Sequence, residues 1–181
     1  MKIFFAFLFT TLFLMAGCGT DDGETGVVSA AIGGRPVPTC YDSNHTKVRT
    51  KSTQSSEGGP AFSTVTPSGQ PVIVFNENFM QAIAHSAAMV MFVYEHECGH
   101  HALGHIQTDK SGHGELRQKD HFKQELDADC YAAQQLRAMG YSSSNIIDII
   151  DDVYPWPKDP EHPSGKVRSR HVAACFKAAG E

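Results

Sequence analysis

The alternation of apolar and polar residues predicts a β-hairpin in the first half of the chain and helices after it. Two short runs rich in β-branched and aromatic residues, 61–66 and 71–75, flank a turn sequence that contains proline and glycine. This pattern is typical of two antiparallel strands. Residues 76–105 contain no proline, and no glycine before Gly99, while apolar residues recur at helical spacing. We therefore expect this segment to form one long buried helix.

Capping and helix-breaking residues divide the rest of the chain into three further helices. They are expected over residues 120–139, 142–153 and 167–179. Gly140 closes the first of these helices and Pro155 stops the second. The segments 107–119 and 157–165, one polar and one rich in proline, are expected to be loops. A hairpin followed by helices indicates an α+β fold, here a mainly helical, zincin-like domain with a small N-terminal hairpin or sheet.

The chain begins with a targeting segment. Lys2 is followed by a run of 14 residues, Ile3 to Ala16, in which only two threonines are not apolar, which is too short to span a bilayer and typical of a secretory signal. Residues 14–18, with the sequence LMAGC, resemble a bacterial lipobox, in which the cysteine, here Cys18, is lipidated. The alternative is ordinary cleavage near Ala16 that leaves Cys18 as a thiol. Either reading exports the protein.

We therefore divide the chain into three parts. Residues 1–17 are the expected signal peptide, 18–38 a flexible tether rich in small polar residues, and 39–181 a single domain. The expected location is the cell envelope, with the domain anchored to the membrane by lipid and facing the periplasm. A formal net charge of −5 argues against nucleic acid as a partner, because binding to a phosphate backbone needs clustered cations.

Four cysteines lie in the expected domain, at positions 40, 98, 130 and 175. In an exported protein an even set of cysteines indicates disulfides, and four cysteines allow three pairings. No two of them have the Cys-x-x-Cys spacing that is typical of a zinc site. We expect their role to be structural.

The main chemical signal is His96-Glu97-Cys98-Gly99-His100, an HExxH motif within the expected long helix. Residues four apart on a helix lie on one face, so the two imidazoles can bind one zinc ion while Glu97 reaches the water beside it. The alternative is that both histidines only occupy a polar helix face. Histidines beside an acid in an apolar helix would be costly to bury without partners, which favours the metal site.

A catalytic zinc site needs a third protein ligand. The metzincin pattern would place glycine and histidine at positions held by Leu103 and Ile106, so that class is disfavoured. His105 would point about 160° away from the metal face if the helix continued. His101 and His105 are then expected to form a polar helix end and contacts behind the ligands.

The better candidate for the third ligand is Glu125 on the next expected helix. Asp129 lies on the same face of that helix, where it can accept a hydrogen bond from a ligand imidazole and fix its tautomer. An exposed acidic face at the start of a helix is the alternative. The position of the pair 25 residues after His100 favours the metal site.

Three blocks of the sequence occur in a recognisable order: His96-Glu97-x-x-His100, Gln124-Glu125-x-x-Ala128-Asp129-x-x-Ala132, and His162-Pro163 with Arg168 six residues after the histidine. In this respect the chain resembles the HtpX and CAAX prenyl protease family of gluzincin metallopeptidases, over roughly Val72 to Ala174. It lacks the membrane-spanning helices of the integral-membrane members, and so is similar to the soluble and lipoprotein members. Its interval between Glu125 and His162 is short.

The resemblance implies a role for each matched residue. His96, His100 and Glu125 would bind one Zn²⁺ per chain, and Glu97 would be the general base. Asp129 would lie behind the ligands and Arg168 would brace the site. His162 would lie near the scissile carbonyl and stabilise the oxyanion. The implied reaction is hydrolysis of peptide bonds, with unfolded or flexible envelope proteins as substrates. The strand Val72 to Phe75 could be the sheet edge that binds an extended substrate, or a plain core strand.

Two other functions fit the same residues. One is a zinc-binding, chaperone-like or structural lipoprotein without turnover, whose closed site would need a fourth protein ligand; four histidines could supply it: His101, His105, His113 and His121. The other is a zinc hydrolase that acts on peptidoglycan peptides. The number of protein ligands around the metal would distinguish the structural protein from a peptidase. The substrate that is cleaved would distinguish the peptidoglycan hydrolase from a protein-cleaving enzyme.

Overall fold

A computed structural model describes residues 36–54, 59–106, 118–153 and 162–178. The expected signal peptide, nearly all of the tether and the lipobox with Cys18 lie outside these ranges. So do Pro155, most of the two expected loops, and His113.

The sheet has three strands, β1 (Arg49–Thr53), β2 (Ala61–Val65) and β3 (Pro71–Asn76), in the order β1-β3-β2. The predicted hairpin is confirmed, because β2 pairs antiparallel with β3. The prediction missed β1, which pairs parallel with β3. Its sequence RTKST is largely exposed and polar, so it lacks the apolar alternation that identifies a strand.

The position of β3 corrects a further expectation. The segment Val72 to Phe75 is not a sheet edge, because β3 has a partner on both sides. Its sequence VIVF is almost entirely buried, as expected for a strand covered on both faces. Within the described sheet, the edges are β1 and β2.

The single long helix expected over residues 76–105 is wrong. The chain forms two helices, α2 (Glu77–Ile83) and α3 (Ala87–Ala102). Ser86 adopts an extended conformation between them and its side chain accepts a hydrogen bond from the amide of Met89, which starts a new helix. Apolar residues continue at helical spacing through this break, so the pattern alone did not reveal it.

The three later helices are confirmed, with ends within about three residues of those expected. They are α5 (Gln118–Ala138), α6 (Ser143–Val153) and α7 (Gly165–Ala178). Gly140 ends α5 with a φ of 88°, a left-handed conformation that glycine adopts without strain. Five helices and a small sheet make up the described chain, which confirms the mainly helical α+β class.

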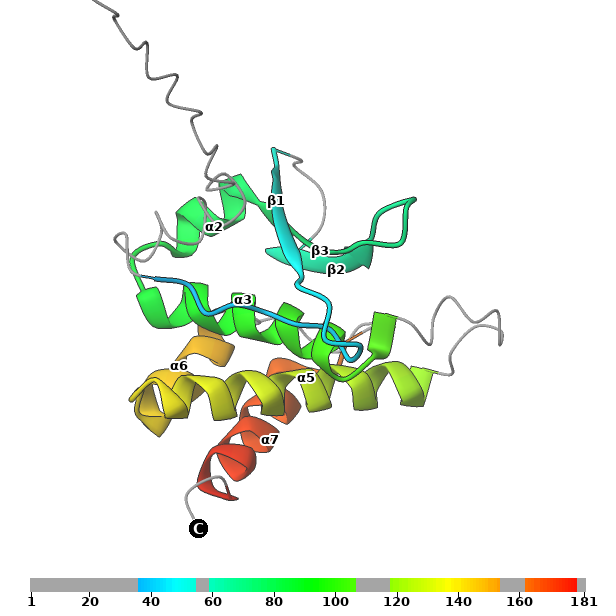
Figure 1. Cartoon of the computed structure of the whole chain (residues 1–181). Coiled ribbons are helices and arrows are strands. Elements are labelled where there is room, and N and C mark those ends of the chain that lie inside the picture. The colour runs from blue at the N-terminus through cyan, green and yellow to red at the C-terminus, as the bar shows by residue number, and fades with distance from the viewer. Residues whose placement is uncertain (1–35, 55–58, 107–117, 154–161, 179–181) are drawn as a thin grey trace, which may run out of the picture.

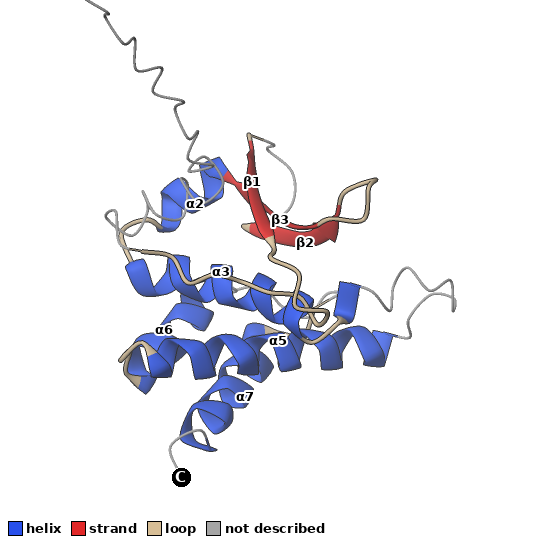
Figure 2. Cartoon of the chain, in the orientation of Figure 1, coloured by secondary structure: helices blue, strands red, loops and turns tan. Residues whose placement is uncertain are grey.

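Helix α3 lies at the centre of the molecule, between the sheet and the other long helix, α5 (Figures 1 and 2). From Met89 to Gly99 every residue of α3 is buried, as expected for a helix that is covered on all sides. Helix α7 packs against both α5 and α6. Among the described residues, none of the helices is both long and apolar enough to span a bilayer.

Two disulfides connect these elements. Cys40, in the segment before β1, pairs with Cys98 on α3, and Cys130 on α5 pairs with Cys175 on α7. The expectation of structural disulfides is met, and one of the three possible pairings is selected. One of the bridged cysteines, Cys98, lies inside the HExxH motif and the other three lie outside it.

Candidate metal centre

The close crossing of α3 and α5 depends on Gly99. A Cβ atom at this position would lie 3.2 Å from both the Cα of Ala128 and the Cβ of Tyr131, which is tighter than ordinary packing. Glycine therefore lets the two helices approach closely at this point. The crossing brings the imidazoles of His96 and His100 on α3 opposite the carboxylates of Glu125 and Asp129 on α5.

Three side chains from the two helices meet at this crossing. The Nε2 atoms of His96 and His100 lie 3.2 Å apart. The Glu125 carboxylate reaches both, with Oε2 3.4 Å from His96 Nε2 and Oε1 3.3 Å from His100 Nε2. These three residues form a group whose donor atoms could hold one metal ion.

The spacing of the donor atoms fits a tetrahedral ion. Nitrogen and oxygen ligands about 2.05 Å from a tetrahedral zinc are separated from one another by roughly 3.3 Å. The separation of 3.2 Å between the two Nε2 atoms matches this value, and each Glu125 oxygen lies at a similar distance, 3.4 or 3.3 Å, from one of the two imidazole nitrogens. The side chains of His100 and Glu125 keep 12% and 14% of their surface exposed, so one side of the group faces solvent.

Behind the group, His96 is held by a buried ion pair. Its Nδ1 lies 2.9 Å from Oδ1 of Asp129, and Arg168 on α7 binds both oxygens of that carboxylate through Nε and one terminal nitrogen, at 2.7 and 2.6 Å. Asp129 and Arg168 are 0% and 1% exposed. Nδ1 of His96 is thereby engaged, and its Nε2 is directed at the metal group. Asp129 therefore contacts both His96 and Arg168.

His105 supports His100 from the other side. Its Nδ1 lies 3.1 Å from Nδ1 of His100, because α3 ends at Ala102 and Gly104, with a φ of 75°, turns the chain back. His105 therefore does not point away from the site, since the helix on which that expectation depended does not continue. Burial, and then the charge of His100, lower its pKa to about 4, so the ring is neutral and its Nδ1 can accept a hydrogen bond from the Nδ1–H of His100.

His101 faces away from the metal group. Its Nε2 lies 3.1 Å from the carbonyl oxygen of Val72 on β3, and the pKa of the ring is lowered chiefly by burial. Its own carbonyl accepts a hydrogen bond from the amide of Ser43. His101 therefore links α3 to the sheet.

Glu97, which follows His96 on α3, is buried and is held by the edge strand β2. The hydroxyl of Ser63 on β2 lies 2.7 Å from Oε2 of Glu97 and 2.8 Å from its carbonyl oxygen, and can donate to either. The sequence analysis missed Ser63. A single polar residue in a short strand carries no signal that could have identified it.

The charges around the site keep both carboxylates ionised. Burial raises the pKa of Glu125, but hydrogen bonds from His100 and His96 outweigh burial and hold this pKa well below its ordinary value. For Asp129, burial is likewise outweighed by the charge and hydrogen bonds of Arg168, so its pKa is lowered. An ionised carboxylate is the form that binds a metal.

The same surroundings favour a positive charge at His96. Burial lowers the pKa of His96, but hydrogen bonds to Asp129 and Glu125 outweigh it and raise the pKa to about 10. Two carboxylates thus favour a positive charge at this position. A bound metal ion competes with this proton for the ring.

The structure does not bring His162 into the metal group. This residue is half-buried and lies three positions before α7 begins at Gly165, whereas the donor group consists of His96, His100 and Glu125.

Comparison with known proteins gave no match to any family model, curated protein or solved structure.

Proposed function

We propose that the protein is a zinc-dependent endopeptidase of the cell envelope that cleaves unfolded or flexible proteins. The observation that carries the proposal is the group of two imidazoles and one carboxylate whose donor atoms lie close enough together to hold one ion, with Glu97 next to His96 on the same helix. Two histidines and a glutamate with an open fourth position are typical of catalytic zinc.

The residues divide the reaction between them. When bound, Zn²⁺ lowers the pKa of water and polarises a peptide carbonyl. Glu97 accepts the proton of the attacking water, whose oxygen bonds to the carbonyl carbon, and passes the proton to the amine when the C–N bond breaks. Ser63 fixes one carboxylate oxygen of Glu97 by its hydrogen bond.

The other side chains set the geometry. Asp129 and Arg168 orient His96, and His105 orients His100. We retain His162 as the candidate for stabilising the oxyanion, because it precedes the helix that carries Arg168 and because the family resemblance assigns it this role.

The arrangement of helices supports the proposed relation to the HtpX and CAAX prenyl protease family, as a soluble, lipoprotein-type member. The three matched blocks come from α3, from α5, and from residues just before α7 together with its first turn. The second and third blocks contribute Glu125, Asp129 and Arg168 to one site. We propose that lipid at Cys18 anchors the domain to the membrane.

The substrate class follows from the edge strand. Within the described sheet, β2 pairs only with β3, and its Ser63 contacts Glu97. A peptide that added to β2 as a further strand would run past the base. Such pairing requires extended backbone, which unfolded or flexible segments offer.

The alternative of a structural zinc site loses support from two of its possible ligands. His101 is turned to the sheet, and His105 contacts Nδ1 of His100, not the Nε2 that faces the metal group. A peptidoglycan peptide remains a candidate substrate of the same chemistry. Parallel assays on casein and on peptidoglycan peptides separate the two substrate classes.

Glu97→Gln tests the proposal. The variant should retain one zinc per chain, because Glu97 is not a ligand, and should lose about 10²–10⁴-fold in cleavage of casein, because an amide accepts no proton. Glu77→Gln, the same change at a half-buried glutamate of α2 whose carboxylate accepts a hydrogen bond from Ser52 on β1, is the matched control and should match wild type in both measurements. Equal cleavage by wild type and Glu97→Gln overturns the assignment of the base. Zinc binding by an inert wild type favours the binding-protein alternative.

The anchor has its own test. Cys18→Ser should abolish lipid labelling and release the domain from the membrane fraction. Labelling that is unchanged in the variant would remove the lipobox interpretation and leave the peptidase proposal untouched.

A further inference from the structure

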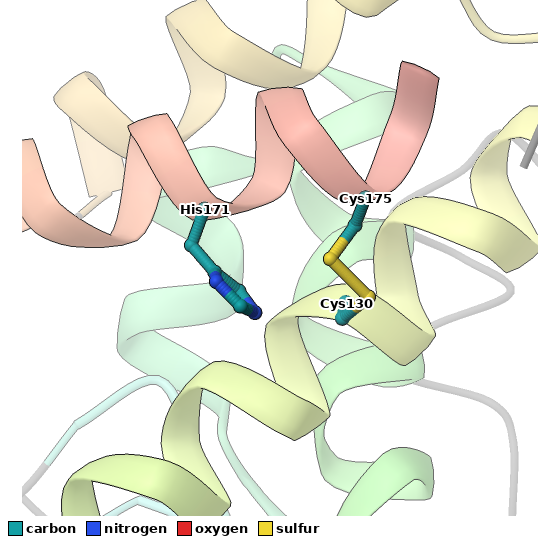
Figure 3. A group of neighbouring side chains, drawn as sticks. All are labelled: Cys130, His171 and Cys175. Carbon is teal, nitrogen blue, oxygen red and sulfur yellow. A yellow bond between two sulfur atoms is a disulfide. The ribbon is translucent and has the colours of Figure 1, made fainter. Parts of the chain in front are cut away.

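A second group of potential metal ligands lies between α5 and α7, apart from the residues used above. It consists of Cys130, His171 and Cys175. Figure 3 shows the His171 ring beside the disulfide, pointing into the space between the two helices. His171 and Cys175 are four residues apart on α7 and so share a face. This group shares no residue with the centre formed by His96, His100 and Glu125.

The Cys130–Cys175 disulfide is the more accessible of the two. Both of its cysteines are half-buried, whereas Cys40 and Cys98 are 3% and 2% exposed. An exposed amide, Nε2 of Gln134, donates a hydrogen bond of 3.6 Å to the sulfur of Cys130. Thiol–disulfide exchange requires that an attacking thiolate reach a sulfur. A reductant can therefore open this bridge before the buried one.

The donor atoms are close enough to bind one ion after reduction. They all lie within 4.8 Å of one another. Two thiolates on a tetrahedral zinc are separated by about 3.8 Å and a thiolate and an imidazole nitrogen by about 3.6 Å. The sulfurs would separate by less than about 2 Å from disulfide distance, which side-chain rotation can supply.

We propose that Cys130, His171 and Cys175 form a second metal site, which takes Zn²⁺ or a similar thiophilic cation once a dithiol reductant has opened the disulfide. Two electrons from the dithiol break the S–S bond, the dithiol becomes a disulfide, and its two protons pass to Cys130 and Cys175. Both protons are released when the thiolates bind the metal. Three protein ligands then hold the ion, and a fourth position stays open.

Either linkage joins the same two helices. Cys130 follows Asp129 directly on α5, and Cys175 lies two turns after Arg168 on α7, so covalent bond and metal would each hold these helices together around the Arg168–Asp129 pair. The ion would replace the disulfide under reducing conditions. The inference does not depend on peptidase activity, because it concerns other ligands.

The test compares metal binding before and after reduction of the wild-type chain. One sample is left oxidised, and the other is treated with a dithiol that is then removed in the absence of air. Both samples are titrated with Zn²⁺ and with Co²⁺. Reduced protein should bind one ion per chain more than oxidised protein. With Co²⁺ it alone should show thiolate-to-cobalt charge-transfer absorption. The result is the difference in bound ions between reduced and oxidised protein. If the His96 centre did not bind zinc, both forms would lose the same ion and this difference would be unchanged.

Two variants assign the extra ion. His171→Ala keeps every cysteine of the chain and should weaken the additional site by at least about 10-fold. The double variant Cys130→Ser/Cys175→Ser keeps Cys40 and Cys98 and should bind no additional ion after reduction. No gain on reduction of wild type overturns the proposal, and so does a gain that persists in the double variant. Should the double variant not fold, unchanged affinity in His171→Ala overturns it.

Discussion

Replacing Arg168 by methionine keeps the length of the side chain but removes the guanidinium group that pairs with Asp129. The carboxylate is 0% exposed and would lose two hydrogen bonds, of 2.7 and 2.6 Å. It would remain buried against the imidazole of His96. Removing one partner of a buried ion pair costs about 3–5 kcal/mol in the free energy of unfolding, because the other charge is left without compensation. In a domain of this size the loss lowers Tm by on the order of 10 °C.

Thermal unfolding at pH 7, followed by circular dichroism, measures this loss. Arg170→Met is the matched control, because Arg170 is exposed on the same helix, and its effect should stay within about 0.5 kcal/mol. The double variant Arg168→Met/Asp129→Leu should be less destabilised than Arg168→Met alone, since no buried charge remains.

The same substitution should also weaken zinc binding. His96 would no longer be held by a carboxylate that is itself fixed, and loss of such support costs about 10–100-fold in metal affinity. Competition with a chelator measures the effect. If Arg168→Met matches Arg170→Met in both Tm and zinc affinity, the reasoning from the buried pair is refuted.

Two further substitutions probe the surroundings of the site. His105→Ala should weaken zinc binding by about 10-fold through loss of its contact with His100, while His85→Ala, at an exposed histidine, should not; equal affinities would contradict the supporting role. Glu95→Gln should stabilise the chain above pH 7 and have little effect at pH 4, as read from Tm at both values. Glu95 is 2% exposed and burial raises its pKa to about 7. Because the pKa is raised in the folded state, Glu95 adds to the free energy of unfolding below the ordinary glutamate pKa, and this contribution is lost as pH rises through 7. A gain that is the same at both pH values would contradict this.

The grouping of the candidate metal ligands and the later helices could be predicted because their signals are local. Glycine and capping residues mark the ends of α5 and α6, and the i, i+4 spacing of His96 and His100 fixes their common face without knowledge of the fold. Glu125 and Asp129 share a face for the same reason. Local spacing does not show which side chains of other elements meet that face.

The missed features depend on contacts between distant segments or on a local conformation that competes with a periodic pattern. Strand β1 is polar, and it is a strand because its backbone pairs with β3. The break before α3 follows from a cap at Ser86 within an unbroken apolar pattern. His105 contacts His100 because the chain turns back at Gly104, which has a positive φ. Ser63 acquires its role only when β2 lies against α3.

The two disulfides stabilise a small domain that buries several charged side chains. They join residues 58 and 45 positions apart, and in the chain-entropy description loops of this length stabilise the folded state by about 4 kcal/mol each. That is similar to the cost of about 3–5 kcal/mol for one uncompensated buried charge. One bridge fixes α3 at Cys98, between the ligands, and the other joins α5 to α7 next to the Arg168–Asp129 pair. Each bridge therefore acts on the helices whose relative position determines whether the buried charges keep their partners.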